Sequence, residues 1–192
     1  MEKKPSRKAK SNNRNKIIEA AIRLIGEKGV EGTSLADIAR DVGISKGTLY
    51  YYYSIKNDLI FDITQDHMDK ITENIFSLIE ENKGKISWQD MIKLLIEMLL
   101  KSETRTRLHL YLIQEVLSGN EDLKKRFVET YTHWFQMIQD GYEILSTRKK
   151  DLTVHARILV SVIDGLIIQA SMGISDVPLE LIIQELARLI DG

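Results

Sequence analysis

The chain has 192 residues, with 27 Lys and Arg against 28 Asp and Glu, so its net charge is close to zero. It contains no cysteine, which excludes disulfide scaffolds, thiolate zinc sites and thiol nucleophiles and fits a reducing compartment. With only 2 prolines and 11 glycines, a composition that is 43% hydrophobic favours a mostly helical globular protein.

No uninterrupted run of apolar residues is long enough to cross a membrane. The most apolar stretch, residues 158–170, is short and contains Asp164. The N-terminal residues are charged or polar and lack the apolar core of a signal peptide. We therefore predict a cytoplasmic protein that makes no membrane contact.

The charge is unevenly distributed along the chain. Residues 1–60 contain 12 Lys and Arg against 7 Asp and Glu, a net charge of +5, whereas the remainder carries 15 against 21, or −6. The basic end is therefore the candidate for binding a polyanion. Residues 1–14 are strongly basic with little to bury, which predicts a flexible arm that is either a solvated tail or a contact to phosphates.

Apolar residues recur at three- and four-residue spacing, with no alternating strand pattern and no internal repeat. This pattern predicts an all-α fold of about nine helices. Three short helices are expected first, over 17–28, over 35–42 and from residue 45. Thr33 or Ser34 should cap the second and Ser45 the third, because a hydroxyl accepts a hydrogen bond from a first-turn N–H.

Longer helices are expected in the rest of the chain. Their predicted ranges are 54–82, 87–100, 103–117, the stretch between breaks at 119–120 and 148–151, 153–172 and 178–190. Ser87 is placed to cap one of them, and Pro178 suits the first turn of the last. The last two helices contain more apolar residues than a single packed stripe requires.

The segment 33–53 has the spacing of a helix-turn-helix. Gly43 can take the positive φ of a tight turn, and the small Ala39 lets two short helices approach closely. The expected local core is Ile38, Val42, Ile44 and Leu49. Residues 46–48 and 50–52 are then left to face outward. The pattern taken alone is also compatible with a helical hairpin inside a larger bundle.

The wider stretch from Gly29 to Leu59 resembles the DNA-binding signature of TetR-family transcriptional regulators. The residues that carry the resemblance are Thr33-Ser34, Ile38-Ala39, the run Val42 to Tyr51, Lys56 and Asp58-Leu59. Total length, helix count and Asp164-Gly165-Leu166 in an apolar helix are also similar to the family. The sequence departs from the family pattern at Tyr52, Tyr53, Ile55 and Asn57.

The resemblance implies a DNA-binding domain over 15–56 and a domain for effector binding and dimerisation over 57–192. It implies that Thr33, Tyr51, Tyr52 and Lys56 contact phosphates, and that Lys46, Gly47, Thr48 and Tyr50 approach base edges. Ser34 and Ser45 complete the expected DNA-binding set, because helix N-terminal N–H groups suit anions. For Tyr53 we favour ordinary packing.

The resemblance also implies a homodimer in which the last two helices pair with their copies. The predicted interface is Val162, Leu166, Ile167, Ala170, Ile182, Ile183, Leu186 and Ile190. An isologous contact of this kind would place two reading helices on a palindromic operator in double-stranded DNA.

A pocket for a small-molecule effector is the second reason for a large C-terminal domain. Candidate lining residues are Phe76, Trp88, Met91, Leu95, Met98, Arg105, His109, Trp134, Met137, Gln169 and Met172. Each can equally be a core residue, since apolar residues at helical spacing need no ligand. Arg105, His109, Gln114 and Gln169 are the polar groups that could orient a ligand.

Catalytic signatures are missing from the sequence. It has no P-loop or H-E-x-x-H motif, and its four histidines never fall at i, i+4 spacing. We predict no enzyme, no cofactor and no metal site. The leading hypothesis is a homodimeric repressor released by a small, largely apolar effector. The alternatives are a helical small-molecule-binding protein with a vestigial DNA-binding head and an adaptor that acts through protein contacts.

Overall fold

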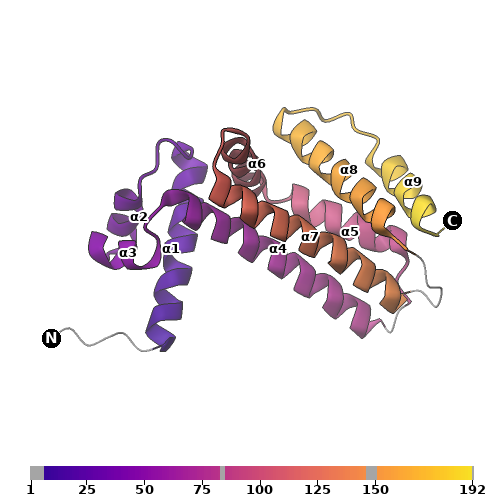
Figure 1. Cartoon of the computed structure of the whole chain (residues 1–192), viewed down its shortest axis with the longest axis horizontal. Helices are drawn as coiled ribbons and strands as arrows, with labels where there is room; N and C mark the ends of the chain where they lie inside the picture. The colour runs from indigo at the N-terminus through magenta and orange to yellow at the C-terminus, as the bar shows by residue number, and fades with distance from the viewer. Residues whose placement is uncertain (1–6, 83–84, 146–150, 192) are drawn as a thin grey trace. The chain divides into compact units, whose positions relative to one another are not determined.

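The computed structural model describes residues 7–82, 85–145 and 151–191, and these residues form helices joined by turns and loops (Figure 1). Within them the predicted all-α fold is confirmed. The helices are α1 (Arg7–Lys28), α2 (Leu35–Val42), α3 (Lys46–Tyr52), α4 (Lys56–Glu81), α5 (Trp88–Leu100), α6 (Glu103–Leu117), α7 (Glu121–Leu145), α8 (Thr153–Ser171) and α9 (Leu179–Asp191).

The chain divides into two compact units, residues 1–66 and 67–192, and the division lies inside α4. The boundary of the DNA-binding domain predicted from the sequence is earlier, at residue 56. The first turns of α4 belong to the N-terminal unit because Leu59, Ile60 and Ile63 are almost fully buried there, as are Ile17 and Ile38. Burial of such residues is the main favourable term that holds short helices together.

The predicted flexible arm is wrong for the residues that the structure describes. α1 begins at Arg7, and residues 7–14 are its first turns, whereas residues 1–6 lie outside the described part. Within this stretch, Arg14 is held in place. Its guanidinium donates to Asp66 at 3.0 and 3.1 Å and to Asp62 at 3.0 Å. These bonds attach α1 to α4 near its N-terminal end.

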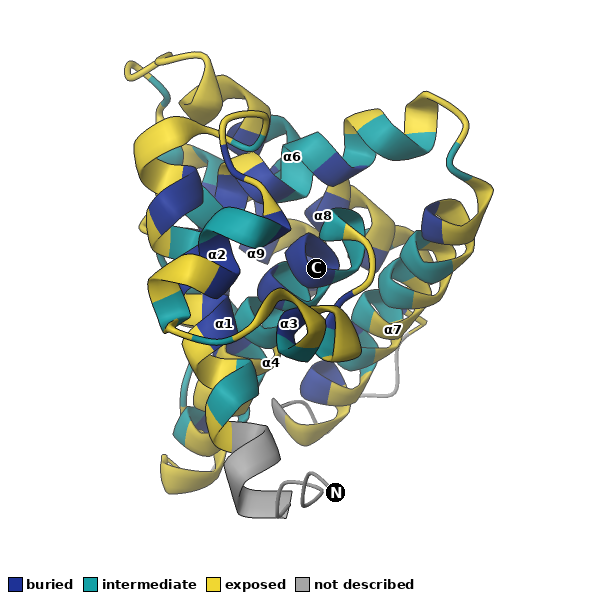
Figure 2. Cartoon of the chain, turned by 90° about the vertical axis from the view of Figure 1, so that its left-hand side faces the viewer, coloured by how far each residue is buried: buried dark blue, intermediate teal, exposed yellow. Residues whose placement is uncertain are grey.

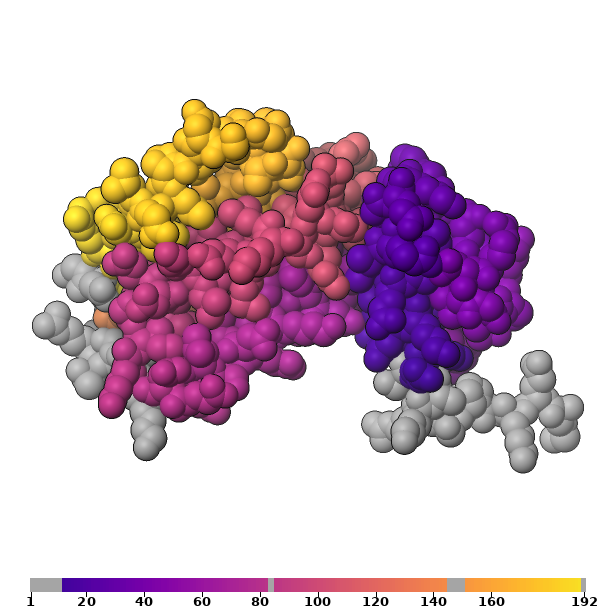
Figure 3. Space-filling view, turned by 180° about the vertical axis from the view of Figure 1, so that it is seen from behind, coloured from indigo at the N-terminus to yellow at the C-terminus, as the bar shows by residue number. Residues whose placement is uncertain are grey.

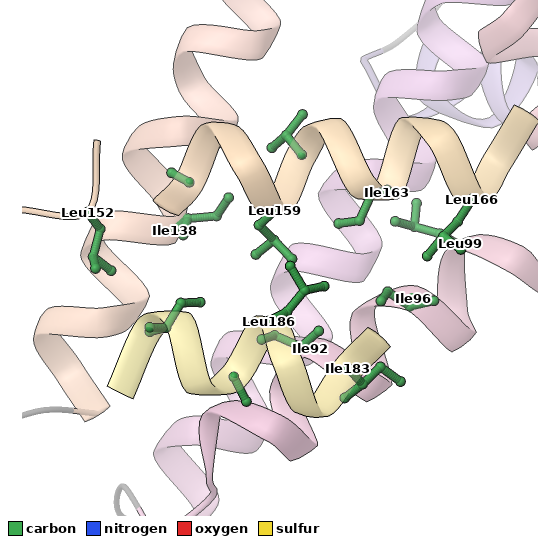
Figure 4. Close-up of a cluster of buried hydrophobic side chains, with 14 of the residues drawn as sticks. Ile92, Ile96, Leu99, Ile138, Leu152, Leu159, Ile163, Leu166, Ile183 and Leu186 are labelled. Atoms are coloured by element: carbon green, nitrogen blue, oxygen red, sulfur yellow. The ribbon is translucent and has the colours of Figure 1, made fainter. Parts of the chain in front are cut away.

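The second unit is built around one apolar cluster from α4, α5, α7, α8 and α9. Figure 4 shows Leu159 of α8 directed toward Leu186 of α9, and Leu166 of α8 beside Leu99 of α5. Ser87 caps α5 as predicted, since its Oγ accepts a hydrogen bond from the Asp90 N–H at 3.1 Å.

Among the described helices, α8 alone is long and apolar enough to cross a membrane by length and composition. Its sequence is interrupted by charged residues, so it contains no fully apolar run of that length. Six of its residues are buried in the core of the second unit, and a core helix has the same composition. Its buried residues are Ala156, Leu159, Val160, Ile163, Leu166 and Ile167.

Candidate functional site

The helix-turn-helix is fixed by two caps and one left-handed glycine. Ser34 caps α2 in a capping box with Asp37, which decides between the two predicted caps. Gly43 ends α2 with φ at 73°, a conformation that only glycine adopts without strain. The Ser45 Oγ then accepts a hydrogen bond from the Thr48 N–H at 3.0 Å and caps α3 as predicted.

Burial divides α3 into an inner and an outer face. Leu49 is 1% exposed and anchors the helix, whereas Lys46 and Gly47 are exposed, and Tyr50 and Tyr51 are 50% and 66% exposed. Figure 2 shows buried and exposed residues along α2 and α3. The exposed side chains carry one cation and two hydroxyls, the groups with which proteins contact phosphates and base edges.

Two predicted phosphate contacts do not fit the positions of their side chains. Thr33 is 1% exposed, and its hydroxyl donates to the carbonyls of Gly29 at 3.0 Å and Leu24 at 3.2 Å. Its role is therefore to hold the loop between α1 and α2. The Tyr52 hydroxyl is buried, with no hydrogen-bond partner among the described residues, so it does not reach the surface. Both residues looked polar and outward in sequence, but local packing turns their oxygens inward.

Lys56 is placed at the start of α4, as predicted, but its ammonium is already engaged. Its Nζ donates to the Val30 carbonyl at 2.8 Å and lies 3.4 Å from the Thr33 carbonyl. These carbonyls belong to the loop between α1 and α2. Lys56 therefore ties that loop to α4, a contact that the sequence pattern does not reveal.

A charged network missed by the sequence analysis links α3 to its surroundings. Tyr53, which is 5% exposed and follows α3, donates its hydroxyl to the Asp62 carboxylate at 2.9 Å. That carboxylate also accepts from Arg14. Burial, and then the neighbouring Asp62, raises the pKa of Tyr53, so the hydroxyl remains a donor. The predicted packing role of Tyr53 is confirmed, and the hydrogen bond fixes the C-terminal end of α3.

The second unit contains a narrow apolar cavity of about 60 Å³. Five predicted effector residues line it, namely Phe76, Trp88, Met91, Leu95 and Met137. The other lining residues are Thr72, Ile75, Ile79, Ile92, Ile138, Gly141 and Leu159. A second, more open hollow of about 200 Å³ is lined by Met68, Asp69, Thr72, Glu73, His133 and Trp134.

The remaining predicted effector residues do not line the narrow cavity. Met98 packs against the apolar cluster, and Arg105 donates to the Ser102 hydroxyl at 3.0 Å. Gln169 and Met172 are exposed, the latter by 71%, because they lie on the outer side of α8 and just beyond its end. Helical spacing alone did not distinguish the inner from the outer side of α8.

His109 and Trp134 belong to an aromatic cluster between α6 and α7. The His109 ring lies 5.7 to 6.4 Å, centroid to centroid, from the rings of Phe127, Trp134 and Tyr131. The Tyr131 hydroxyl donates to Asp164 at 3.0 Å, and the His109 Nε2 lies 3.9 Å from the same carboxylate. Burial lowers the pKa of His109 to about 4 and raises that of Asp164. This cluster of aromatic rings therefore encloses one imidazole and one carboxylate.

We expect this buried imidazole to make stability depend on pH. The pKa of His109 falls from 6.5 to about 4 on folding. Above pH 6.5 this imidazole is neutral in both states and does not lower the free energy of unfolding. As the pH falls from 6.5 toward 4, protonation favours the unfolded chain and the free energy of unfolding decreases. The full loss from this group is about 3 kcal/mol, partly offset by Asp164, whose raised pKa acts in the opposite direction. His109→Phe should reduce the pH dependence of the urea-unfolding free energy over this range. Part of the dependence should remain, because burial also lowers the pKa of His67 to about 4. His133→Phe at the surface should leave the dependence unchanged. An unchanged slope in His109→Phe would contradict this account.

Most residues predicted for the dimer interface are already buried within the second unit of the single chain. Leu166, Ile167, Ile183, Leu186 and Ile190 are at most 5% exposed and belong to the core of the second unit. Among the predicted residues, Ala170 is exposed and Val162 and Ile182 are half-buried. The outward apolar residues of the two helices are instead Val154, Ile158, Ile168, Leu181 and Leu189, together with Met172.

The exposed apolar residues on α8 and α9 form one candidate surface, called here the α8–α9 face. Ile158 and Leu189 line the same shallow hollow between the two helices. Figure 3 shows the atoms of α8 and α9 gathered, in orange to yellow, on one surface of the second unit. Contiguous exposed apolar side chains are typical of interaction surfaces.

Residues 17–63, which contain the helix-turn-helix, match the sequence model described as bacterial regulatory proteins, tetR family. The chain is a TetR-family transcriptional regulator. The TetR family consists of DNA-binding regulators and not of enzymes, which agrees with the sequence-based predictions. Within the described part of the chain, no group of His, Asp and Glu side chains is arranged to hold a metal ion.

Curated relatives of this TetR-family chain are also regulators. The HTH-type transcriptional regulator SAR2658 of Staphylococcus aureus strain MRSA252 is 25% identical over 154 residues, which cover 78% of this chain and 80% of the relative. The negative transcriptional regulator IcaR of the biofilm operon icaADBC, from strain Newman, is 34% identical over 110 residues. That match covers 56% of this chain and 58% of IcaR.

A solved TetR-family structure extends the likeness in fold to nearly the whole chain. Thermus thermophilus FadR, a TetR-family transcriptional repressor in complex with lauroyl-CoA, superposes with a TM-score of 0.68 at 18% identity. The superposition covers 92% of each chain. This likeness establishes that the second unit shares the helical architecture of FadR.

Proposed function

We propose that this TetR-family regulator is a homodimeric repressor that binds a palindromic operator and is released by a small, largely apolar effector. The observation that carries the proposal is the outer face of α3, where Lys46, Tyr50 and Tyr51 are exposed around the buried anchor Leu49. A repressor role is supported by the names of IcaR, a negative regulator, and FadR, a repressor.

Contacts to base edges and contacts to phosphates are assigned to different residues of the N-terminal unit. Lys46, at the first turn of α3, can donate to guanine O6 or N7, and Thr48 can contact a thymine methyl. Gly47 is exposed beside them and lets the backbone approach the groove. Tyr51, with the N–H groups at the starts of α2 and α3 beside Ser34 and Ser45, is assigned to phosphates.

Dimerisation is assigned to the α8–α9 face. A repressor that reads a palindrome needs a two-fold contact, in which the same surface of each copy meets the other. Val154, Leu181 and Leu189 are 64%, 61% and 48% exposed in the single chain, so burying them against a second copy would be favourable.

The narrow cavity in the second unit is assigned to the effector. α4 contributes Thr72, Ile75, Phe76 and Ile79 to its lining, and the same continuous helix begins in the N-terminal unit at Lys56. A ligand that displaces this part of α4 would therefore move a helix that continues into the DNA-binding unit.

The proposed function is tested first by a gel shift on the DNA upstream of the protein's own gene, with random DNA as competitor. We expect specific binding that a compound co-purified with the protein, and identified by mass spectrometry, weakens by about 100-fold. That factor corresponds to about 2.7 kcal/mol, and the operator must weaken binding of the compound equally. Calorimetry should measure the affinity for DNA with and without the compound, and the affinity for the compound with and without DNA. Independent binding of DNA and compound would refute the regulatory coupling.

Lys46 and Lys56 provide a matched pair of variants within the head. Lys46→Ala should cost about 1 to 3 kcal/mol at one base position in each half-site and relax sequence preference there. Lys56→Ala should weaken binding to specific and non-specific DNA alike, because it frees the loop carbonyls of Val30 and Thr33. Fluorescence anisotropy over a salt series gives both quantities.

The salt series also decides what the Lys56 ammonium contacts. If it only holds the loop, the slope of the logarithm of the DNA-binding constant against the logarithm of the salt concentration should stay nearly constant in Lys56→Ala. If it also contacts one phosphate per subunit, the slope should fall by about 1.8 for a dimer. A change in base preference in Lys56→Ala, with a uniform loss in Lys46→Ala, would show that the head docks in another orientation.

A further inference from the structure

Trp88 lines the narrow cavity and carries a buried hydrogen-bond donor that no described residue uses. Its indole N–H is buried and has no hydrogen-bond partner among the described residues, although the side chain lines the cavity. A buried donor without an acceptor carries a desolvation cost that a ligand oxygen would remove. We propose that the cavity takes an uncharged apolar molecule with one acceptor oxygen, which receives the hydrogen bond of the Trp88 Nε1–H.

The rest of the lining favours a neutral ligand. The only other polar side chain among the described lining residues is Thr72, whose hydroxyl donates to the Met68 carbonyl at 2.9 Å. None of the lining side chains that the structure describes is charged. An ammonium or carboxylate that entered the cavity would lose its hydration with no opposite charge to replace it, and that loss is far larger than for a neutral group.

The Trp88 ring is held in a defined position. It stacks on Tyr142 with ring centroids 5.7 Å apart and an interplanar angle of 26°. Gly141 lies beside it, where a Cβ atom would be 3.9 Å from the indole Cη2. At the other end of the residue, the Ser87 cap fixes the first turn of α5. A donor on a ring that is stacked and capped can orient a ligand without first losing its own freedom.

The size of the cavity limits the ligand to a small molecule or to one end of a larger one. A volume of about 60 Å³ corresponds to about four water-sized spheres. Met91 and Met137 lie in its wall, and methionine side chains repack readily around a guest. An engineered apolar cavity of about 150 Å³ binds benzene. The present cavity is smaller, so a single substituted benzene ring probes it only if Met91 and Met137 repack around the ring.

The test uses four probes of nearly the same shape on the full-length protein. Acetophenone carries a carbonyl acceptor, α-methylstyrene replaces the oxygen by CH₂, and benzoate and benzamidinium carry a negative and a positive charge. Binding is followed by titration of the indole N–H signals of Trp88 and Trp134 in ¹⁵N NMR spectra, without DNA. We expect acetophenone to bind about 5-fold more tightly than α-methylstyrene, from one net neutral hydrogen bond, and to move the Trp88 signal. Both charged probes should bind at least about 10-fold more weakly than acetophenone.

Two tryptophan variants assign the effect to one side chain. Trp88→Phe keeps an aromatic ring and removes the N–H, so the ratio between acetophenone and α-methylstyrene should fall to about 1. Trp134→Phe is the matched control, because Trp134 lines the other hollow, and it should keep the 5-fold ratio. If Trp88→Phe fails to fold, the ratio in the native protein and the shift of its Trp88 signal still decide.

Several results would overturn the inference. These are equal binding of acetophenone and α-methylstyrene, tightest binding by a charged probe, binding by none of the four, or an unmoved Trp88 signal. The inference rests on the proposed function only in treating this cavity as the effector site. Because the titration contains no DNA, a protein that binds acetophenone as expected but no operator would refute the repressor proposal alone. Operator binding without probe selectivity would refute the cavity assignment alone.

Discussion

Ile158→Glu should convert the proposed dimer into a folded monomer and reduce specific operator affinity by at least about 100-fold. Ile158 is 37% exposed in the single chain and lines the α8–α9 hollow with Leu189, so the carboxylate is solvated in the monomer. In the dimer it would be buried next to its copy without a partner, at a cost of several kcal/mol. A monomer engages only one half-site at a time and loses the gain from linked binding. Light scattering and fluorescence anisotropy measure the two effects.

The matched control is Val128→Glu on α7, a residue that is 63% exposed and lies outside the α8–α9 face. It introduces the same charge at an apolar surface position, and it should leave both the mass and the operator affinity unchanged. A dimer that persists in both Ile158→Glu and Leu181→Glu would place the interface elsewhere on the chain.

Leu166→Glu should unfold the second unit instead of dissociating a dimer. Leu166 is 5% exposed and packs in the core beside Leu99, so the carboxylate has no access to water in the folded state. The loss of packing and the buried charge together should cost at least about 4 kcal/mol, a large part of the 5 to 15 kcal/mol that stabilises a typical domain. Urea unfolding followed by circular dichroism measures the change.

Leu166→Met is the control for this second variant. It conserves volume and polarity, so it should cost less than about 1.5 kcal/mol. A Leu166→Glu protein that is a stable, folded monomer would restore the interface predicted from the sequence. A protein that unfolds at all concentrations would support the assignment of Leu166 to the core.

The sequence alone determined most of the helix positions and the helix-turn-helix. The ranges 35–42 and 103–117 agree with α2 and α6, and the caps at Ser45 and Ser87 were located from hydroxyls before apolar runs. These features depend on residues within a few positions of one another, and local spacing therefore predicts them. The turn at Gly43 belongs to the same class, because a left-handed backbone position favours glycine wherever it occurs.

Only the tertiary structure decided which sides of the helices face the core and which polar groups are engaged. The apolar residues of α8 and α9 occupy more than one side, and periodicity cannot tell a side buried in its own chain from one left for a partner. Arg14 looked like part of a basic arm because its partners Asp62 and Asp66 lie about 50 residues away in sequence. Whether the Lys56 ammonium binds the loop between α1 and α2 or is available to DNA likewise depends on carbonyls 23 and 26 positions earlier in the chain. Such contacts form only when the chain folds, because they join residues that no local pattern connects.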